Sequence, residues 1–194
     1  MALFIDSLAV MLIGLAMGLV IGAFYFFFKA RGNEKQLESL VVPGFAVGFF
    51  NFVSGFIMSF TWPLPSGYNM LFGDPLLVFG LLMMASAYML YRKMDLGLIP
   101  LLYSLLGIYV LVGAYAIVQY TLESGDNLIT AMGLYISSGI GAVIAPIAYL
   151  KTTTAARNLY YVEWIILGVA AVFALVIGYI ALDEHILDFA KWFP

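Results

Sequence analysis

The sequence predicts an all-α integral membrane protein, a bundle of six transmembrane helices with both termini outside the cell. Three observations support this class. Of the 194 residues, 64% are hydrophobic and only 10% are charged. The mean hydropathy is +1.06. Long apolar segments alternate with short breaks that hold most of the charges. A soluble domain is about half apolar and about a quarter charged, so a water-soluble fold could not bury this much apolar surface. No linker or low-complexity segment divides the chain, and we expect a single domain over residues 1–194.

The apolar segments have the length that a membrane-spanning helix needs. A bilayer core about 30 Å thick is crossed by about 20 helical residues. The segments do not alternate apolar and polar residues, as the strands of a membrane β-barrel would, and a helix satisfies its own backbone hydrogen bonds in lipid. The predicted spans are Ser7–Phe28, Leu40–Phe60, Pro75–Tyr91, Leu96–Tyr120, Leu128–Leu150 and Leu159–Leu182.

The charged breaks predict the orientation of the bundle. Seven of the eight basic residues fall after the first, third and fifth spans, and only Lys191 lies on the other side. The positive-inside rule places the side rich in lysine and arginine in the cytoplasm. We therefore expect both termini outside and a multi-pass protein of the plasma membrane. The first apolar run is longer than the core of a secretory signal peptide, and no cleavage-like site follows it.

The run "SFTWPLPSGYNMLFGDP", Ser59–Pro75, joins the second and third predicted spans. Its three prolines prevent one continuous helix, yet its only charge is Asp74. Irregular backbone at this depth survives where protein or a water-filled cavity borders it. We expect a folded outer cap that includes Trp62, Tyr68, Asn69 and Asp74. The alternative is a short tethering loop with interfacial aromatic residues.

Small residues recur at helical spacing in three spans. Small side chains let membrane helices approach closely, so most such stripes form packing surfaces; the alternatives are a pore wall or an interface between copies. The stripes are Gly14, Gly18 and Gly22 in the first span, Gly44, Gly48, Asn51 and Gly55 in the second, and Gly133, Ser137, Gly141 and Ala145 in the fifth.

The sequence lacks the residue sets of an enzyme or a metal centre. It has no cysteine and a single histidine, His185, which lies beyond the last predicted span. Two-histidine haem ligation and a cysteine nucleophile are excluded, and no nucleophile–base set is visible. His185 suits a solvated terminus; a weak metal site or a pH-responsive patch is the alternative. We expect no enzyme activity, no cofactor, no metal site and no nucleic-acid partner.

Two polar residues stand out inside the spans. Glu163 is the only carboxylate within a predicted span, and such residues are functional candidates by default. The alternatives are that Glu163 reaches the headgroups or pairs with Arg157. Asn51, with Ser54 one turn on, must find hydrogen-bond partners. It either joins two helices or faces a conduit.

Polar side chains in the fifth span are weaker candidates of the same kind. The candidates for a pore lining are Asn51, Ser54, Tyr135, Ser137, Ser138 and Glu163. No ring of central charges is present to select ions, and no arginine-rich helix is present to sense voltage. A small uncharged polar solute therefore suits a passage through this bundle best.

The first half of the chain resembles a family of uncharacterised archaeal membrane proteins, a domain-of-unknown-function family. The "SFTWPLPSGYNMLFGDP" run and the "FID" at Phe4–Asp6 carry this resemblance. It implies no activity.

A more distant resemblance is to the urea/amide channel family of bacteria. It is carried by Gly73, Pro75 and Phe79-Gly80, by the "MDLGLIPLLYSLLGIY" segment, by "ESGD" at Glu123–Asp126 and by Glu163. The resemblance implies a six-helix protomer with its own pore, assembled into a hexameric ring around lipid.

This sequence departs from that family where the family's urea channels line their constrictions. The fifth span has no tryptophan, and Leu81 and Ala85 stand where the family has pore aromatics. Urea selectivity is the inference that these changes weaken most.

These observations lead to two expectations about function. The first is a passive channel or facilitator for a small neutral polar solute, urea-like or amide-like, in a urea/amide-channel-like bundle that forms homo-oligomers. The second is a non-conducting accessory or scaffold subunit of a larger membrane assembly. An acid-responsive gate formed by the outer carboxylates is a side hypothesis.

Overall fold

The structure, a computed structural model, describes residues 7–64, 67–150 and 153–192. In these ranges the chain is almost entirely helical, and six helices are long and apolar enough to cross a membrane. The elements are α1 (Ser7–Ala30), α2 (Glu34–Ser39), α3 (Val41–Thr61), the π-helical turn η1 (Asn69–Gly73), α4 (Asp74–Tyr91), α5 (Ile99–Gln119), α6 (Gly125–Ile144), the 3₁₀ turn η2 (Ala145–Tyr149) and α7 (Thr154–Trp192).

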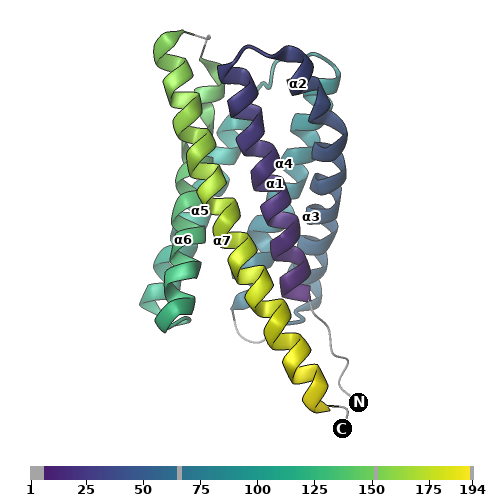
Figure 1. The fold of residues 1–194 in the computed structure, drawn as a ribbon, viewed down its shortest axis with the longest axis vertical. Helices are drawn as coiled ribbons and strands as arrows, with labels where there is room; N and C mark the ends of the chain where they lie inside the picture. The colour runs from purple at the N-terminus through teal and green to yellow at the C-terminus, as the bar shows by residue number, and fades with distance from the viewer. Residues whose placement is uncertain (1–6, 65–66, 151–152, 193–194) are drawn as a thin grey trace.

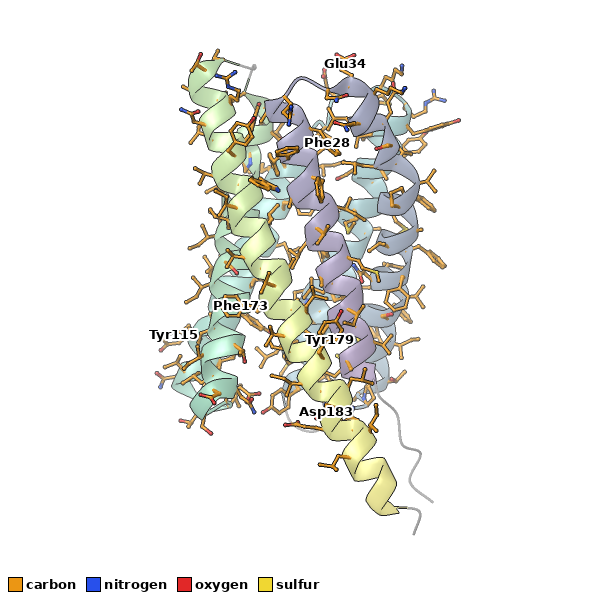
Figure 2. All side chains as sticks on the ribbon, in the orientation of Figure 1. Phe28, Glu34, Tyr115, Phe173, Tyr179 and Asp183 are labelled. Atoms are coloured by element: carbon orange, nitrogen blue, oxygen red, sulfur yellow. The ribbon has the colours of Figure 1, made fainter. Side chains whose placement is uncertain are left out.

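The long helices form a closed ring. Each packs against the next in the order α1, α3, α4, α5, α6 and α7, and α7 returns to pack against α1 (Figure 1). We call the end where α1 begins and α7 finishes the terminal end. The opposite end, which holds α2 and η2, is the α2 end. Along the bundle the side chains are mostly hydrocarbon, and nitrogen and oxygen atoms gather at the two ends (Figure 2). That distribution suits a protein that spans a bilayer.

Helices α1 and α7 pack through a heptad pattern of small and large apolar residues. One set of buried residues in α1 is spaced alternately three and four apart, and one set in α7 follows the same rule. This spacing gives the knobs-into-holes packing of nearly parallel or antiparallel helices. The residues of these two sets are Ala9, Leu12, Ala16, Leu19, Ala23, Phe26 and Ala30 in α1, and Ala156, Tyr160, Glu163, Leu167, Ala170 and Ala174 in α7. Glu163 is thus a carboxylic acid at a position where the pattern otherwise places apolar or aromatic side chains.

Helices α3 and α4 approach so closely that glycine is required at the contact. A Cβ atom built on Gly80 would lie 2.2 Å from the backbone nitrogen of Phe52, and one on Gly55 would lie 2.3 Å from that of Leu77. Gly44 and Gly48 are buried along the same side of α3. The small-residue stripe of this span therefore lies in a helix–helix contact.

The observed helices differ from the predicted spans mainly at their ends. Helix α2 was not predicted; Asn33 caps it by accepting a hydrogen bond of 3.2 Å from the backbone nitrogen of Gln36. Helix α6 gives way to a 3₁₀ turn at Ala145, because Pro146 follows and has no backbone N–H to donate. Helix α7 continues well beyond the last predicted span, to Trp192.

Candidate functional site

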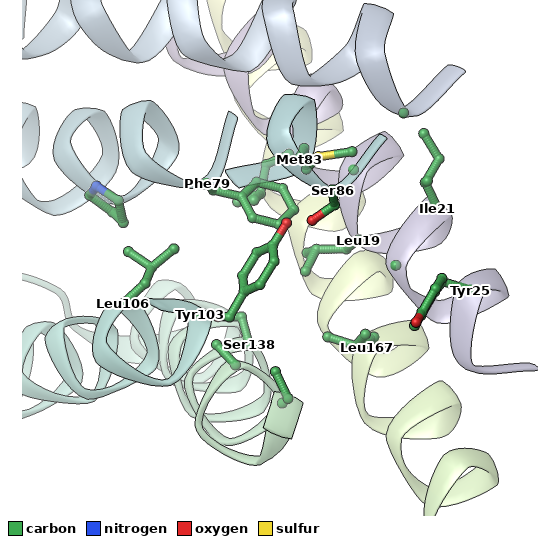
Figure 3. Close-up of a pocket in the computed structure, with 18 of the residues that line it drawn as sticks. Leu19, Ile21, Tyr25, Phe79, Met83, Ser86, Tyr103, Leu106, Ser138 and Leu167 are labelled. Atoms are coloured by element: carbon green, nitrogen blue, oxygen red, sulfur yellow. The ribbon is translucent and has the colours of Figure 1, made fainter. Parts of the chain in front are cut away.

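The ring encloses a cavity of about 190 Å³. Its wall comes from all six long helices, and α3 contributes Gly44. It runs from Leu71 and Phe72 near the terminal end to Leu96 and Ala148 at the α2 end. Most of the wall is hydrocarbon, including Leu19, Phe79, Met83, Leu106 and Leu167 (Figure 3). For comparison, an apolar cavity of about 150 Å³ is enough to bind benzene. The space therefore suits one small organic molecule or a few water molecules.

Glu163 is the one carboxylic acid in the cavity wall. Its side chain is only 1% exposed, and its Oε2 atom has no hydrogen-bond partner among the described residues. Gly141 on α6 leaves room for the carboxyl group, since a Cβ at that position would lie 3.3 Å from Oε1. A buried polar atom without a partner is costly, so this carboxyl group is the strongest indication of a functional site in the bundle.

Several hydroxyl groups also line the cavity, and most of them donate their proton to a helix carbonyl. Ser138 donates to the carbonyl of Leu134 at 2.6 Å, and Ser86 donates to that of Leu82 at 2.8 Å. The hydroxyls of Tyr103 and Ser86 point toward each other across the wall (Figure 3). A hydroxyl has one proton and two lone pairs, so these groups keep acceptor capacity after their proton is used.

The terminal end of the cavity is closed by aromatic side chains and the connector. Tyr135 donates a hydrogen bond of 2.6 Å to the carbonyl of Leu71 in η1. The ring of Phe72 lies between Tyr135, at a centroid distance of 6.0 Å, and Tyr68, at 6.4 Å. Phe72 also lines a second, much smaller space of about 10 Å³ toward α1. Leu15 and Leu76 also line both spaces, so these three side chains lie between them.

The described part of the connector is held by its own hydrogen bonds. Asn69 is fully buried, and its side chain donates to the carbonyl of Leu64 at 2.5 Å and accepts from the Leu64 nitrogen at 2.9 Å. Tyr68 donates to the carbonyl of Leu122, between α5 and α6, at 2.8 Å. Trp62 ends α3 in a left-handed conformation with a φ of 53° and is half exposed.

Asp74, the fourth residue of the predicted cap, lies at the first position of α4. Its Oδ2 atom accepts a hydrogen bond of 3.0 Å from the hydroxyl of Tyr109 on α5. Asp74 does not belong to the cavity wall.

At the α2 end, Lys29 is held by η2 and by two aromatic rings. Its ammonium group donates to the carbonyl of Ala148 in η2 and lies 5.6 Å from the ring centre of Tyr25 and 5.5 Å from that of Tyr160. The Tyr160 hydroxyl donates to the carbonyl of Leu150 at 2.5 Å. Lys29 thus connects η2, which follows α6, to α1 and α7.

The structure brings together Tyr135, Ser138 and Glu163 of the residues predicted to line a pore. The other three lie outside the cavity wall. Asn51 is fully buried and donates a hydrogen bond of 3.1 Å to the carbonyl of Gly14 on α1. Ser54 is half-buried on α3. Ser137 donates to the carbonyl of Gly133, one turn back, at 2.5 Å.

Other polar residues of the cavity wall were not predicted as site residues from the sequence. Tyr25, Ser86 and Tyr103 line the same cavity from three other helices. The signal that could have found the site is the heptad pattern of α7, in which a glutamate replaces an apolar residue between Tyr160 and Leu167. Partners on other helices cannot be assigned from spacing along one helix.

Two observations bear on the alternatives predicted for Glu163, a pair with Arg157, and for His185, a weak metal site. In the described part of the chain, the ion pair present is between Lys93 and Glu38, at 2.9 Å, and Glu163 and Arg157 form none. No group of three or more histidine, cysteine, aspartate or glutamate residues in the described ranges could hold a metal ion.

These features define a multi-pass helical membrane protein whose six-helix ring surrounds an apolar cavity with one buried carboxyl group. The chain belongs to the family described as "Protein of unknown function (DUF981)", whose model matches residues 1–188. The predicted membership of a domain-of-unknown-function family is thus confirmed. No curated protein and no solved structure matched the chain.

Proposed function

We propose that the protein is a passive channel or facilitator for a small neutral polar solute, and that the solute passes through the interior of each six-helix ring. The observation that carries this proposal is the cavity of about 190 Å³ with Glu163 in its wall. A helical bundle that only had to be stable would fill this space with side chains, because protein interiors are close-packed.

The lining supports a neutral solute better than a permeant ion. Glu163 is one acidic group in a wall made mostly of hydrocarbon, and selective ion pathways use rings of charges or of backbone carbonyls. A few hydroxyl oxygens, from Tyr103, Ser138 and Ser86, supply the hydrogen bonds that a small polar molecule loses when it leaves water.

The proposal includes the orientation and assembly expected from the sequence. The α2 end, with most of the basic residues, faces the cytoplasm of an archaeal cell, and both termini face outside the plasma membrane. The α2 end of the cavity then faces the cytoplasm, and the connector with Phe72 forms the outer constriction. We also propose that the helices are arranged as in the urea/amide channels and that the protein forms homo-oligomers such as hexamers.

Solute flux into liposomes tests the proposal directly. Purified protein is reconstituted, and swelling is followed with urea, acetamide, glycerol and ammonia against empty vesicles. We expect at least one of these solutes to enter faster with protein. Ser138→Phe, which fills the cavity, should remove the increase. Ile136→Phe, at an exposed position of the same helix, should not. Equal rates with and without protein for every solute would exclude the proposal.

A second candidate function is a non-conducting accessory or scaffold subunit. The closed terminal end favours it, because Tyr68, Asn69 and Tyr135 all hold that end shut with hydrogen bonds to backbone groups. This candidate predicts no solute flux together with a partner protein that stays bound in fixed stoichiometry through purification. Flux from the purified chain alone would contradict it.

A further inference from the structure

The carboxyl group of Glu163 lies in the cavity wall with no cation beside it in the described part of the chain. We propose that the cavity binds a small primary alkylammonium ion, with its ammonium group on Glu163 and its alkyl chain against the apolar wall. This goes beyond the proposed function, and its test measures binding without solute flux, so the two can fail separately.

The charge of Glu163 is the first argument. A buried carboxylate is strongly destabilising unless a cation or several hydrogen bonds compensate it. Its side chain is 1% exposed, and Oε2 has no hydrogen-bond partner among the described residues. In either charge state one carboxyl oxygen remains an acceptor. A ligand with several N–H donors and a positive charge satisfies both requirements.

Neither Lys29 nor Arg157 compensates the charge of Glu163. Lys29 donates to the carbonyl of Ala148 and contacts the rings of Tyr25 and Tyr160. Arg157, on the same helix as Glu163, is exposed and does not line the cavity. The cation that compensates Glu163 is therefore expected to come from outside the chain.

The hydroxyl groups of the wall are the second argument. Ser138, Ser86 and Tyr135 each donate their proton to a backbone carbonyl, at 2.6, 2.8 and 2.6 Å. Their oxygens can accept further hydrogen bonds but have no second proton to give. A cavity rich in acceptors favours a ligand rich in donors. An alkylammonium head has three N–H donors, whereas a carboxylate or an ester has none.

The remainder of the wall defines the body of the ligand. Leu19, Met83, Leu106 and Leu167 present hydrocarbon, and the rings of Phe79 and Tyr103 pack edge to face at 6.2 Å (Figure 3). Aromatic faces also attract cations. The volume of about 190 Å³ exceeds the roughly 150 Å³ that suffices for benzene. An alkyl chain of butyl length fits this space.

Isothermal titration calorimetry on the purified full-length protein in detergent tests the proposal, with heats from protein-free detergent subtracted. The three probes are n-butylammonium chloride, 1-butanol and tetramethylammonium chloride. They have the same number of non-hydrogen atoms in the organic molecule. Butanol lacks the charge, and tetramethylammonium lacks the N–H donors. We expect n-butylammonium to bind about tenfold or more tightly than either, because hydrogen bonds between charged buried groups are the strong ones.

Two variants assign the effect to Glu163. Glu163→Gln keeps the shape but removes the charge, so the preference for n-butylammonium over 1-butanol should disappear. Retained binding of 1-butanol by this variant would show that the cavity is intact. Glu184→Gln, the same change at an exposed position of α7, should leave the preference unchanged.

Each other outcome overturns the proposal. Equal affinity for 1-butanol in the unmodified protein would show that charge plays no part. Equal affinity for tetramethylammonium would show that the N–H donors play none. Absence of binding by n-butylammonium would remove the site altogether, and this comparison does not depend on any variant folding correctly.

Discussion

Tyr135 donates a hydrogen bond of 2.6 Å to the carbonyl of Leu71, which joins the middle of α6 to the π-helical turn that precedes α4. A π-helical turn leaves backbone groups outside the usual pattern, and such turns are frequent at functional sites. Tyr135 therefore stabilises an irregular segment by supplying a hydrogen bond that a regular helix would not need from another helix.

Removing this hydroxyl should destabilise the terminal end. Tyr135→Phe leaves the partly buried carbonyl of Leu71 without this donor, and we expect a loss of about 1 to 3 kcal/mol in the free energy of unfolding. Thermal unfolding in detergent measures it. Tyr115→Phe, at an exposed position of α5, is the control and should change little. An unchanged melting temperature for Tyr135→Phe would show that this bond contributes nothing.

The contact between α3 and α4 should not tolerate a methyl group. Gly80→Ala places a Cβ 2.2 Å from the nitrogen of Phe52, so the helices must separate, and we expect a sharp fall in the yield of folded protein. Gly168→Ala is the matched control, since nothing lies within 4 Å of its Cβ position and alanine favours a helix. Size-exclusion profiles of both variants check this. Similar profiles for the two would contradict the close approach.

Asn51 should matter for stability and not for solute flux. Its side chain is directed to the carbonyl of Gly14 and does not reach the cavity wall. For Asn51→Leu we expect a loss of about 1 kcal/mol, the usual scale for polar contacts between membrane helices. Liposome flux per folded molecule should be unchanged. A specific fall in flux would instead place Asn51 on the solute pathway and support the pore-lining prediction.

Phe72 should control passage at the terminal end if the cavity conducts. Like Leu15 and Leu76, it lines both the main cavity and the space of about 10 Å³ toward α1. Phe72 has the largest side chain of the three, so Phe72→Ala should widen the connection between the two spaces. We expect solute flux several-fold faster than in the unmodified protein, by the same swelling assay. Phe60→Ala, at an exposed site on α3, serves as control. Unchanged flux from folded Phe72→Ala protein would place the constriction elsewhere.

The terminal end should also weaken in strong alkali through Tyr68. Burial raises the pKa of the Tyr68 hydroxyl above its ordinary value of 10.0, and the negative charge of Glu123 adds to the shift. A phenol whose pKa is raised on folding contributes stability that is complete below pH 10.0 and is lost as the pH rises through the folded pKa. Melting temperatures between pH 8 and pH 11 should fall more steeply for the unmodified protein than for Tyr68→Phe. Parallel curves would exclude this role.

The spans themselves could be predicted because lipid imposes a simple rule on each segment. Each of the six apolar stretches is long enough to cross the bilayer as a helix. The observed boundaries of α3, α4 and α5 lie within a few residues of the prediction. Helix α2 could not be predicted in this way, because six residues such as Glu34–Ser39 form a helix only when capped and held by neighbours.

The cavity lies beyond what the sequence pattern predicts. Glu163 was identified as a candidate because a carboxyl group in lipid is rare, whereas the other residues of the wall depend on how six helices meet around the cavity. Nothing in the sequence distinguishes Tyr103 and Ser86 from other residues of apolar helices, and only the packing of the six helices places them in one cavity wall. Asn51 and Ser138 are both polar residues within an apolar span. The way each helix is turned about its axis places Asn51 against α1 and Ser138 in the cavity wall.

Helix α7 is a single rod of 39 residues, which at about 1.5 Å per residue is nearly twice as long as a bilayer core is thick. It extends past the rest of the bundle at the terminal end (Figure 1). A helical fusion partner joined in register to this rod would inherit its direction, and would give electron microscopists a fixed marker outside the detergent belt of a very small particle.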